Sequence, residues 1–236
     1  MSVNELTKEL HSLADQARAA ILGRFFKTGP GQYGEGDQFL GIMVPTAHKL
    51  VSKYYLELDL ANIDKLISSP YHEIRLVALL MLVKKYEKTK LDTEKIKIYE
   101  YYLEHRQFIN NWDLVDLSTP KIVGDYLLSR PRGVLYQLAS SDNLWERRIS
   151  IMATFAFIRA GVFEDTLKLS KVLLHDPHDL IHKAVGWMLR EMGKKDKMTL
   201  LNFLNEYASV MPRTMLRYAI EKLSESERQY YLKKES

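Results

Sequence analysis

Residues 71–86, YHEIRLVALLMLVKKY, have the apolar spacing of a buried α-helix. One helix face carries apolar residues at the i, i+3, i+4, i+7 and i+8 positions: Ile74, Val77, Ala78, Met81 and Leu82. Further apolar residues fill much of the remaining surface, so we expect this helix to be buried on most sides. No stretch of the sequence alternates strictly between apolar and polar residues over four to eight positions. The sequence therefore predicts no core strand.

Helix starts of similar composition recur at a regular spacing. Each has a turn with Pro or Asn, a basic residue about five positions later and then an apolar helix; the turns lie at Ser69-Pro70, Asp142-Asn143, Asp176-Pro177 and Met211-Pro212. Positions 142, 177 and 212 are 35 residues apart, and position 70 lies 72 before 142, which leaves room for a unit near Trp112. This period is typical of HEAT or armadillo repeats. We predict one all-α solenoid domain over residues 1–236, with an irregular helical bundle as the alternative.

The composition is that of a globular, cysteine-free protein. Apolar residues make up 46% of the 236 residues, which excludes wholesale disorder, and 11 Gly with 7 Pro are few for a β-sandwich or barrel. The absence of cysteine excludes disulfides, thiol nucleophiles and cysteine-ligated metal sites. No apolar run reaches the length of a membrane span, and the first residues lack a signal-peptide pattern. We expect a cytoplasmic protein with no membrane partner.

Basic residues recur in phase with the proposed repeats. The net charge is +4, and each repeat carries a cation near its helix start: Arg75, Arg148, Lys183 and Arg217. Equivalent positions of a solenoid line one surface, so the pattern predicts a basic stripe in a concave groove. Such a stripe is the electrostatic footprint of a duplex-binding protein. The alternative is that these are ordinary solvated surface residues.

Two tryptophans share a helix face with charged residues. Trp112 and Asp116 are i and i+4 on an expected helix, whereas Asp113 points elsewhere. Lys183, Trp187 and Arg190 are i, i+4 and i+7 on another expected helix. An indole among cations suits stacking on a base or sugar, and the alternative is that both tryptophans are core residues.

Two further segments stand out. The loop 27–38 matches G-x-G-x-x-G, but no strand precedes it, so a turn between helices or a loop on a nucleic-acid backbone fits better than a dinucleotide site. His175, His178 and His182 are close in sequence and could form a metal site. The same segment has the pattern of a turn followed by a capped helix start. We expect no metal and no cofactor.

Several motifs together resemble the AlkD-like DNA alkylation repair enzymes, which are DNA glycosylases built from HEAT-like repeats. The motifs are Phe39-Leu40-Gly41-Ile42 with Pro45, Asn111-Trp112-Asp113-Leu114-Val115-Asp116 with Pro120 and Gly124-Asp125, Ser141–Arg148, and Lys183–Glu191. They occur in order along nearly the whole chain. The resemblance implies excision of alkylated purines that carry a positive charge, such as N7- and N3-alkylpurines, from double-stranded DNA.

The resemblance also implies roles for individual residues. Asp116 matches the catalytic aspartate, Trp112 and Trp187 match two indoles that contact the lesion nucleotide, and Arg148 and Arg190 match residues that hold DNA. Phe25 stands where some members have a DNA-contacting tyrosine. We expect a monomer. A DNA-binding protein without excision activity and a protein–protein scaffold remain the alternatives, since HEAT-like arrays serve both.

Overall fold

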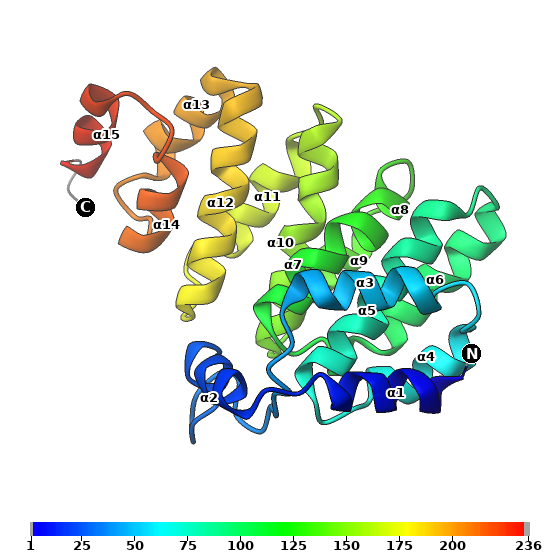
Figure 1. The fold of residues 1–236 in the computed structure, drawn as a ribbon. Helices are drawn as coiled ribbons and strands as arrows, with labels where there is room; N and C mark the ends of the chain where they lie inside the picture. Colours follow the sequence, from blue (N-terminus) through cyan, green and yellow to red (C-terminus); the bar gives the residue numbers. More distant parts are fainter. Residues whose placement is uncertain (1, 234–236) are drawn as a thin grey trace. The chain divides into compact units, whose positions relative to one another are not determined.

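All regular elements of the described chain, residues 2–233 of this computed structural model, are helical (Figure 1). The β-type pairing within these residues is an isolated bridge between Gln38 and Tyr71. The all-α prediction is therefore confirmed. None of the helices between residues 2 and 233 combines the length and hydropathy needed to cross a bilayer.

The chain divides into two compact units, and the boundary along the sequence lies between Ser118 and Thr119. The first contains α1 (Val3–Ser12), α2 (Gln16–Phe25), α3 (Val44–Tyr54), α4 (Leu60–Ile67), α5 (His72–Lys88), α6 (Asp92–Glu104), the 3₁₀ helix η1 (Arg106–Phe108) and nearly all of α7 (Trp112–Thr119). The second contains the π-helix η2 (Pro120–Gly124), α8 (Asp125–Leu127), α9 (Gly133–Ala139), α10 (Leu144–Arg159), α11 (Glu164–Val172), α12 (Asp179–Lys195), α13 (Lys197–Tyr207), α14 (Arg213–Ala219) and α15 (Glu225–Leu232). That both units belong to one repeat domain stays a prediction.

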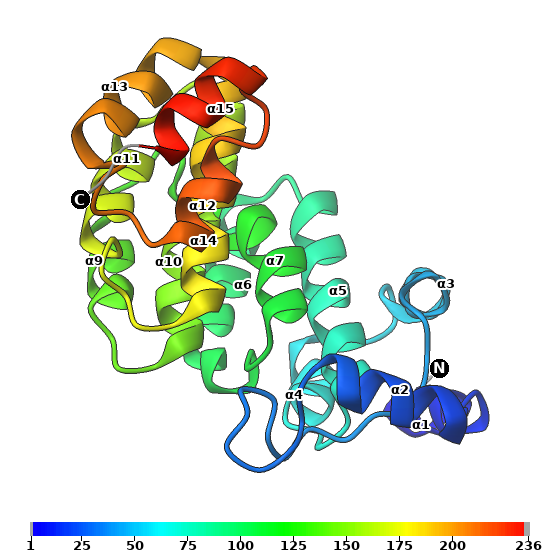
Figure 2. The same ribbon diagram turned by 90° about the vertical axis from the view of Figure 1, so that its left-hand side faces the viewer.

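Helix α5 is the core of the first unit, as its sequence predicts. It packs against α3, α4 and α6, and its buried residues run without interruption from His72 to Val83. This continuous burial agrees with the apolar character of the helix on most sides. The stretch that decides the fold therefore also positions the helices around it (Figure 2).

The first turn of α5 holds the segment that precedes α3. The Glu73 carboxylate is buried and accepts backbone N–H bonds from Leu40 at 2.9 Å, Gly41 at 2.8 Å and Ile42 at 3.1 Å. Gly41 has φ +86°, and a Cβ there would lie 2.2 Å from the Asp15 carbonyl oxygen. Glycine is therefore required, because φ is positive and the chain passes directly against the backbone at the start of α2. This arrangement explains the Phe39–Ile42 motif structurally.

A basic residue fastens the turn before each of three helices. Arg75 donates to the Ser69 carbonyl at 2.8 Å, and Arg147 donates to the Ser141 carbonyl at 2.9 Å. His182 makes the equivalent bond through Nε2 to the Asp176 carbonyl. In each case the acceptor lies six residues before the donor, and the donor is the fourth residue of its helix. The fourth residue of each of these three helices thus has a structural role.

This register corrects the predicted stripe. Arg75 is equivalent to Arg147 and His182, not to Arg148 and Lys183, which occupy the fifth helix position. A shift of one residue rotates a side chain by about 100° around the helix axis. The predicted stripe is therefore wrong for Arg75, which is 3% exposed. It is also wrong for Arg148, which is 4% exposed because its guanidinium turns inward to the Leu180 carbonyl.

In the second unit, α12 packs closely between α10 and α14. Gly186 of α12 permits the approach to α14, since a Cβ there would lie 2.5 Å from the Met215 carbonyl oxygen. This contact supports the helix that carries Trp187 and Arg190.

Replacing Glu73 with alanine should destabilise the first unit severely. The substitution leaves three buried N–H groups without their acceptor, so we expect a loss of about 3 kcal/mol or more in the free energy of unfolding. Urea unfolding followed by circular dichroism measures this loss. Glu87→Ala, an exposed position on the same helix, is the matched control and should change stability by about 0.5 kcal/mol or less. Equal stability of the two variants would contradict the role assigned to Glu73.

Candidate functional site

Helix α7 carries two carboxylates, Asp113 and Asp116, that differ in burial. Trp112 and Asp116 are half-buried and lie one turn apart on the same side of α7. Asp113 is 8% exposed, accepts the Leu114 N–H at 2.8 Å and hydrogen-bonds to His72. Asp113 is thus held by the protein interior, whereas Asp116 retains solvent access beside an indole.

Trp112 lies on a stack of aromatic rings. Its ring packs on Phe26 with centroids 5.3 Å apart and planes inclined by 24°. Phe26 packs on Phe39 at 5.2 Å, and Phe39 packs on His72 at 4.7 Å. Phe25 meets the edge of Trp112 at 6.0 Å and is 61% exposed. The structure therefore brings Phe25 and Trp112 together and gives the indole an apolar support.

A buried ionic network lies beneath this stack. His72 is 2% exposed, and its Nε2 lies 2.8 Å from Asp113 Oδ2 while its Nδ1 lies 3.3 Å from Asp37 Oδ2. Arg75 donates to Asp37 Oδ1 at 2.7 Å. Asn111 donates to Asp37 Oδ2 at 3.2 Å and accepts the Trp112 backbone N–H at 2.8 Å. Two cations thus balance two carboxylates in the interior.

The network shifts the pKa of its members. Burial alone would lower the pKa of His72, but the hydrogen bonds to Asp113 and Asp37 outweigh it and raise that pKa to about 9. Burial also opposes ionisation of Asp37, yet the hydrogen bond from His72 and the charge of Arg75 hold the pKa of Asp37 below its ordinary value. At neutral pH, His72 is therefore an imidazolium.

Helix α12 presents the second predicted indole. Trp187 is half-buried, packs against Phe155 at 6.1 Å and donates from Nε1 to Glu191 at 3.2 Å. Glu191 also accepts from Arg190 at 3.0 Å and from Lys194 at 2.7 Å. Arg190 forms a further ion pair with Glu221. The carboxylates therefore neutralise much of the positive charge around Trp187.

The remaining predicted DNA-binding cations differ in their availability. Arg148 is buried and donates to the Leu180 carbonyl at 2.6 Å, and Arg75 is committed to Asp37. Lys183 pairs with Asp179 at 2.8 Å, but both side chains are 40% exposed or more, which makes this pair weak. Arg217 is exposed, and its side chain makes no hydrogen bond or ion pair to another described residue. Among the four cations of the predicted stripe, Lys183 and Arg217 have the more accessible side chains.

The histidine cluster has a structural role in its turn. His178 accepts the Leu180 N–H at 3.1 Å, and His182 bonds to the Asp176 carbonyl. Asp176 pairs with Arg147 at 2.6 Å. The described residues contain no group of three metal-ligating side chains placed to hold an ion. The capped helix start therefore accounts for His178 and His182.

The loop 27–38 ends in the ionic network. Its bends use Gly31 and Gly36 with positive φ, and Asp37 anchors the end of the loop to α5. The loop begins directly after α2 rather than after a strand. It therefore connects helices and delivers Asp37 to the interior.

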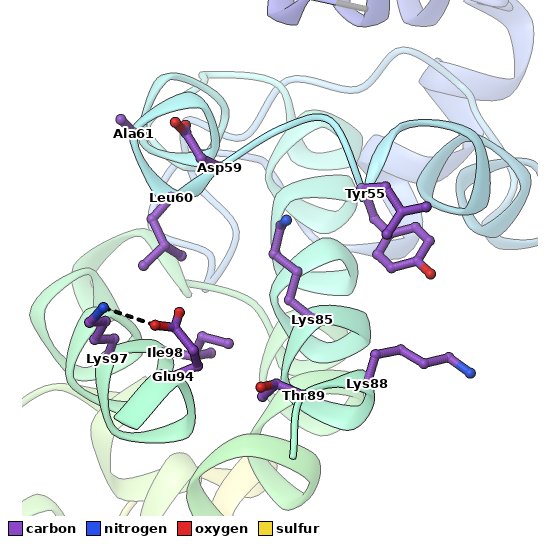
Figure 3. A pocket seen from close by; sticks show the side chains of 11 residues that line it. Tyr55, Asp59, Leu60, Ala61, Lys85, Lys88, Thr89, Glu94, Lys97 and Ile98 are labelled. Atoms are coloured by element: carbon purple, nitrogen blue, oxygen red, sulfur yellow. Dashed lines mark hydrogen bonds and ion pairs between the residues drawn. The ribbon is translucent and has the colours of Figure 1, made fainter. Parts of the chain in front are cut away.

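A pocket of about 600 Å³ lies at the opposite end of α5 from His72 (Figure 3). It is lined by Tyr55, Leu56, Asp59, Leu60, Ala61, Lys85, Lys88, Thr89, Glu94, Lys97 and Ile98. None of the residues predicted for the site belongs to this lining.

Sequence reasoning missed His72, Glu73 and Asp37. The available signal was the pair His72-Glu73 at the start of an otherwise apolar helix, since buried polar residues require partners. Most of the partners lie between 31 and 35 residues earlier in the chain, and Asp113 lies 41 residues later. Local periodicity gives no information over such separations.

Comparisons with known proteins agree with this description. The sequence profile of the family described as DNA alkylation repair enzyme matches residues 6–223. A solved structure, the predicted DNA alkylation repair enzyme from Enterococcus faecalis, is similar with a TM-score of 0.71. The similarity covers 90% of this chain and 97% of that one at 18% sequence identity, so it supports the fold. No curated protein matches the sequence significantly.

The raised pKa of His72 predicts a pH-dependent stability. Its contribution is fully present below the unfolded pKa of about 6.5 and is lost as the pH rises through about 9. We expect the free energy of unfolding to fall by about 3 kcal/mol from this group over that range. Urea unfolding between pH 6 and pH 10 measures the fall. His72→Gln should lack it, and His48→Gln, an exposed histidine on α3, should retain it. The same pH dependence in both variants would show that His72 is not the titrating group.

Proposed function

The chain belongs to the family of DNA alkylation repair enzymes, and on that premise we propose that it is a DNA glycosylase. Its substrates are alkylated purines with a formal positive charge, N7- and N3-alkylpurines, in double-stranded DNA. The reaction hydrolyses the N-glycosidic bond and leaves an abasic site. The observation that carries this proposal is the pairing of Trp112 with the half-buried Asp116 on one side of α7.

The chemistry requires little from the protein at the base. An N7-alkylated purine already carries the positive charge that makes it a good leaving group, so no general acid is needed. Positive charge then develops on the deoxyribose as the bond to the base breaks. A carboxylate beside the sugar stabilises that charge and can orient the attacking water. Asp116 is the residue proposed for this role.

The indoles suit the same transition state. The face of an indole attracts a cation by about 0.5–2 kcal/mol, depending on how far water is excluded. Trp112 is supported from one side by Phe26, which fixes the plane of its ring. Trp187 is fixed by Phe155 and Glu191. We propose that both indoles contact the lesion nucleotide.

The proposed phosphate contacts are Lys183, Arg217 and Arg190. Phe25, beside Trp112, is proposed as a further contact to DNA. Arg190 must exchange part of its pairing with Glu221 and Glu191 for phosphate, whereas Arg217 requires no such exchange. Arg148 is proposed to act from the interior through α12, since its guanidinium binds the Leu180 carbonyl. The partner is double-stranded DNA, and the protein acts as a cytoplasmic monomer.

Asp116→Asn should remove the electrostatic stabilisation while keeping the shape of the side chain. Losses of this kind amount to about 2.7–4 kcal/mol, or about 10²–10³ in rate. Affinity for DNA should persist or increase, because a negative charge facing phosphate is removed. Single-turnover excision of N7-methylguanine from a duplex measures the effect, with circular dichroism to confirm folding. Equal rates for wild type and Asp116→Asn would refute the assignment.

The matched control for this experiment is Asp142→Asn. Asp142 is an exposed carboxylate in the turn before α10, and its substitution should leave the rate unchanged. Asp113→Asn, which the sequence alone would have favoured as a control, is unsuitable because Asp113 is bonded to the buried His72. Binding of the lesion duplex by wild type without excision would support the non-catalytic alternative.

Removing an exposed phosphate contact should reduce the salt dependence of binding. Each phosphate contact releases counterions, so log affinity falls linearly with log salt, and losing one contact lowers the slope by about one. We expect this reduction for Arg217→Ala. Binding to an undamaged duplex at several salt concentrations measures it, and Lys222→Ala provides a nearby control. Unchanged affinity and slope for Arg217→Ala would exclude Arg217 as a contact, and a flat salt dependence for wild type would favour a scaffold.

A further inference from the structure

Both ring nitrogens of His72 face carboxylate oxygens. Nε2 lies 2.8 Å from Asp113 and Nδ1 lies 3.3 Å from Asp37, with the ring 2% exposed. A neutral imidazole has a single N–H, so one of its nitrogens would turn a lone pair toward an oxygen that cannot donate. The imidazolium donates from both nitrogens. The geometry of the two bonds therefore requires a charged ring.

Each of the two carboxylates bonded to His72 is also connected to Trp112. Asp113 directly follows Trp112 in α7. Asp37 accepts from the Asn111 side chain, whose oxygen in turn accepts the Trp112 backbone N–H at 2.8 Å. The two bonds of His72 therefore reach the residues on either side of Trp112.

The ring of His72 also supports the indole through stacking. It packs on Phe39 at 4.7 Å and on Phe26 at 4.9 Å, and Phe26 contacts Trp112. Stacked rings slide over one another at little cost, whereas charge-assisted hydrogen bonds fix distance and direction. The aromatic stack therefore supplies burial, and the ionic bonds determine where α7 begins.

We propose that His72, as an imidazolium, is the positioning residue for Trp112, and through the first turn of α7 for Asp116. It does so by holding loop 27–38, α5 and α7 in one arrangement. The charged groups that face it are Asp37 from the loop, Asp113 from α7 and Arg75 from its own helix. The effect of His72 on catalysis rests on the proposed glycosylase function. The position and the charge of the His72 ring are independent of that function.

The first experiment measures protonation without reference to activity. Nitrogen-15 spectra of the imidazole rings should show both nitrogens of His72 protonated at pH 8. The indole N–H resonance of Trp112, assigned with Trp112→Phe, should shift in His72→Gln and stay in place in His48→Gln. A neutral His72 at pH 8, or an unmoved Trp112 resonance, would overturn the inference even in a protein without excision activity.

The second experiment separates positioning from folding and from binding. Displacement of a reacting group by about 1 Å costs about 100-fold in rate, so we expect single-turnover excision by His72→Gln to fall about 10- to 100-fold. Affinity for undamaged duplex should change less than about threefold, because His72 contacts no phosphate. The wild-type rate, corrected for enzyme-free depurination, should fall above about pH 9, and this limb should be absent from His72→Gln.

A double variant guards against misfolding. His72→Phe with Asp113→Asn keeps an aromatic ring in the stack and removes one cation together with one anion, so no buried charge is left unbalanced. We expect this variant to fold and still to excise slowly, because α5 and α7 are no longer bonded. Wild-type rates in the folded double variant would overturn the positioning role. Absence of excision by wild type would instead reject the glycosylase function, and the spectra would still decide the charge of His72.

Discussion

The first unit depends on two adjacent buried residues at the start of α5. Glu73 gathers the backbone N–H groups of residues 40–42, and His72 bonds to Asp37 and Asp113. A buried carboxylate or imidazolium is strongly destabilising unless its partners are in place. The loop, α5 and α7 therefore adopt one arrangement together. This constraint links the interior of the unit to the aromatic surface on which Trp112 lies.

The arrangement gives neighbouring residues of α7 different tasks. Asp113 turns inward and completes the ionic network, whereas Asp116 remains half-buried on the side that carries Trp112. Asp116 is the fifth residue of α7. The fifth residue is a cation in α10, α12 and α14, where it is Arg148, Lys183 and Arg217. An acid at a position where these three helices carry a cation is suited to the positive charge of an alkylpurine and its sugar. Asp116 thus combines this position in its helix with the proposed catalytic role.

Much of the architecture could be predicted from the sequence, because helical periodicity and the 35-residue spacing are local signals. The buried helix α5 and the shared side of Trp112 and Asp116 follow from spacing alone. The exposure of each cation does not follow from spacing, because Arg148 and Arg217 both occupy the fifth position of their helices, yet Arg148 is buried and Arg217 is exposed. The network of His72, Asp37 and Asp113 could not be predicted from the sequence for another reason. Its members are far apart in the chain, and only the fold brings them together.

The central claim is that the protein breaks the N-glycosidic bond of a positively charged purine. The most direct measurement uses a duplex with a single N7-methylguanine, incubated with wild-type protein and then treated with mild alkali, which cleaves strands at abasic sites. The account predicts cleavage at the lesion well above the enzyme-free rate and no cleavage of the same duplex with guanine. Tight binding of the lesion duplex with cleavage no faster than the enzyme-free rate would contradict it.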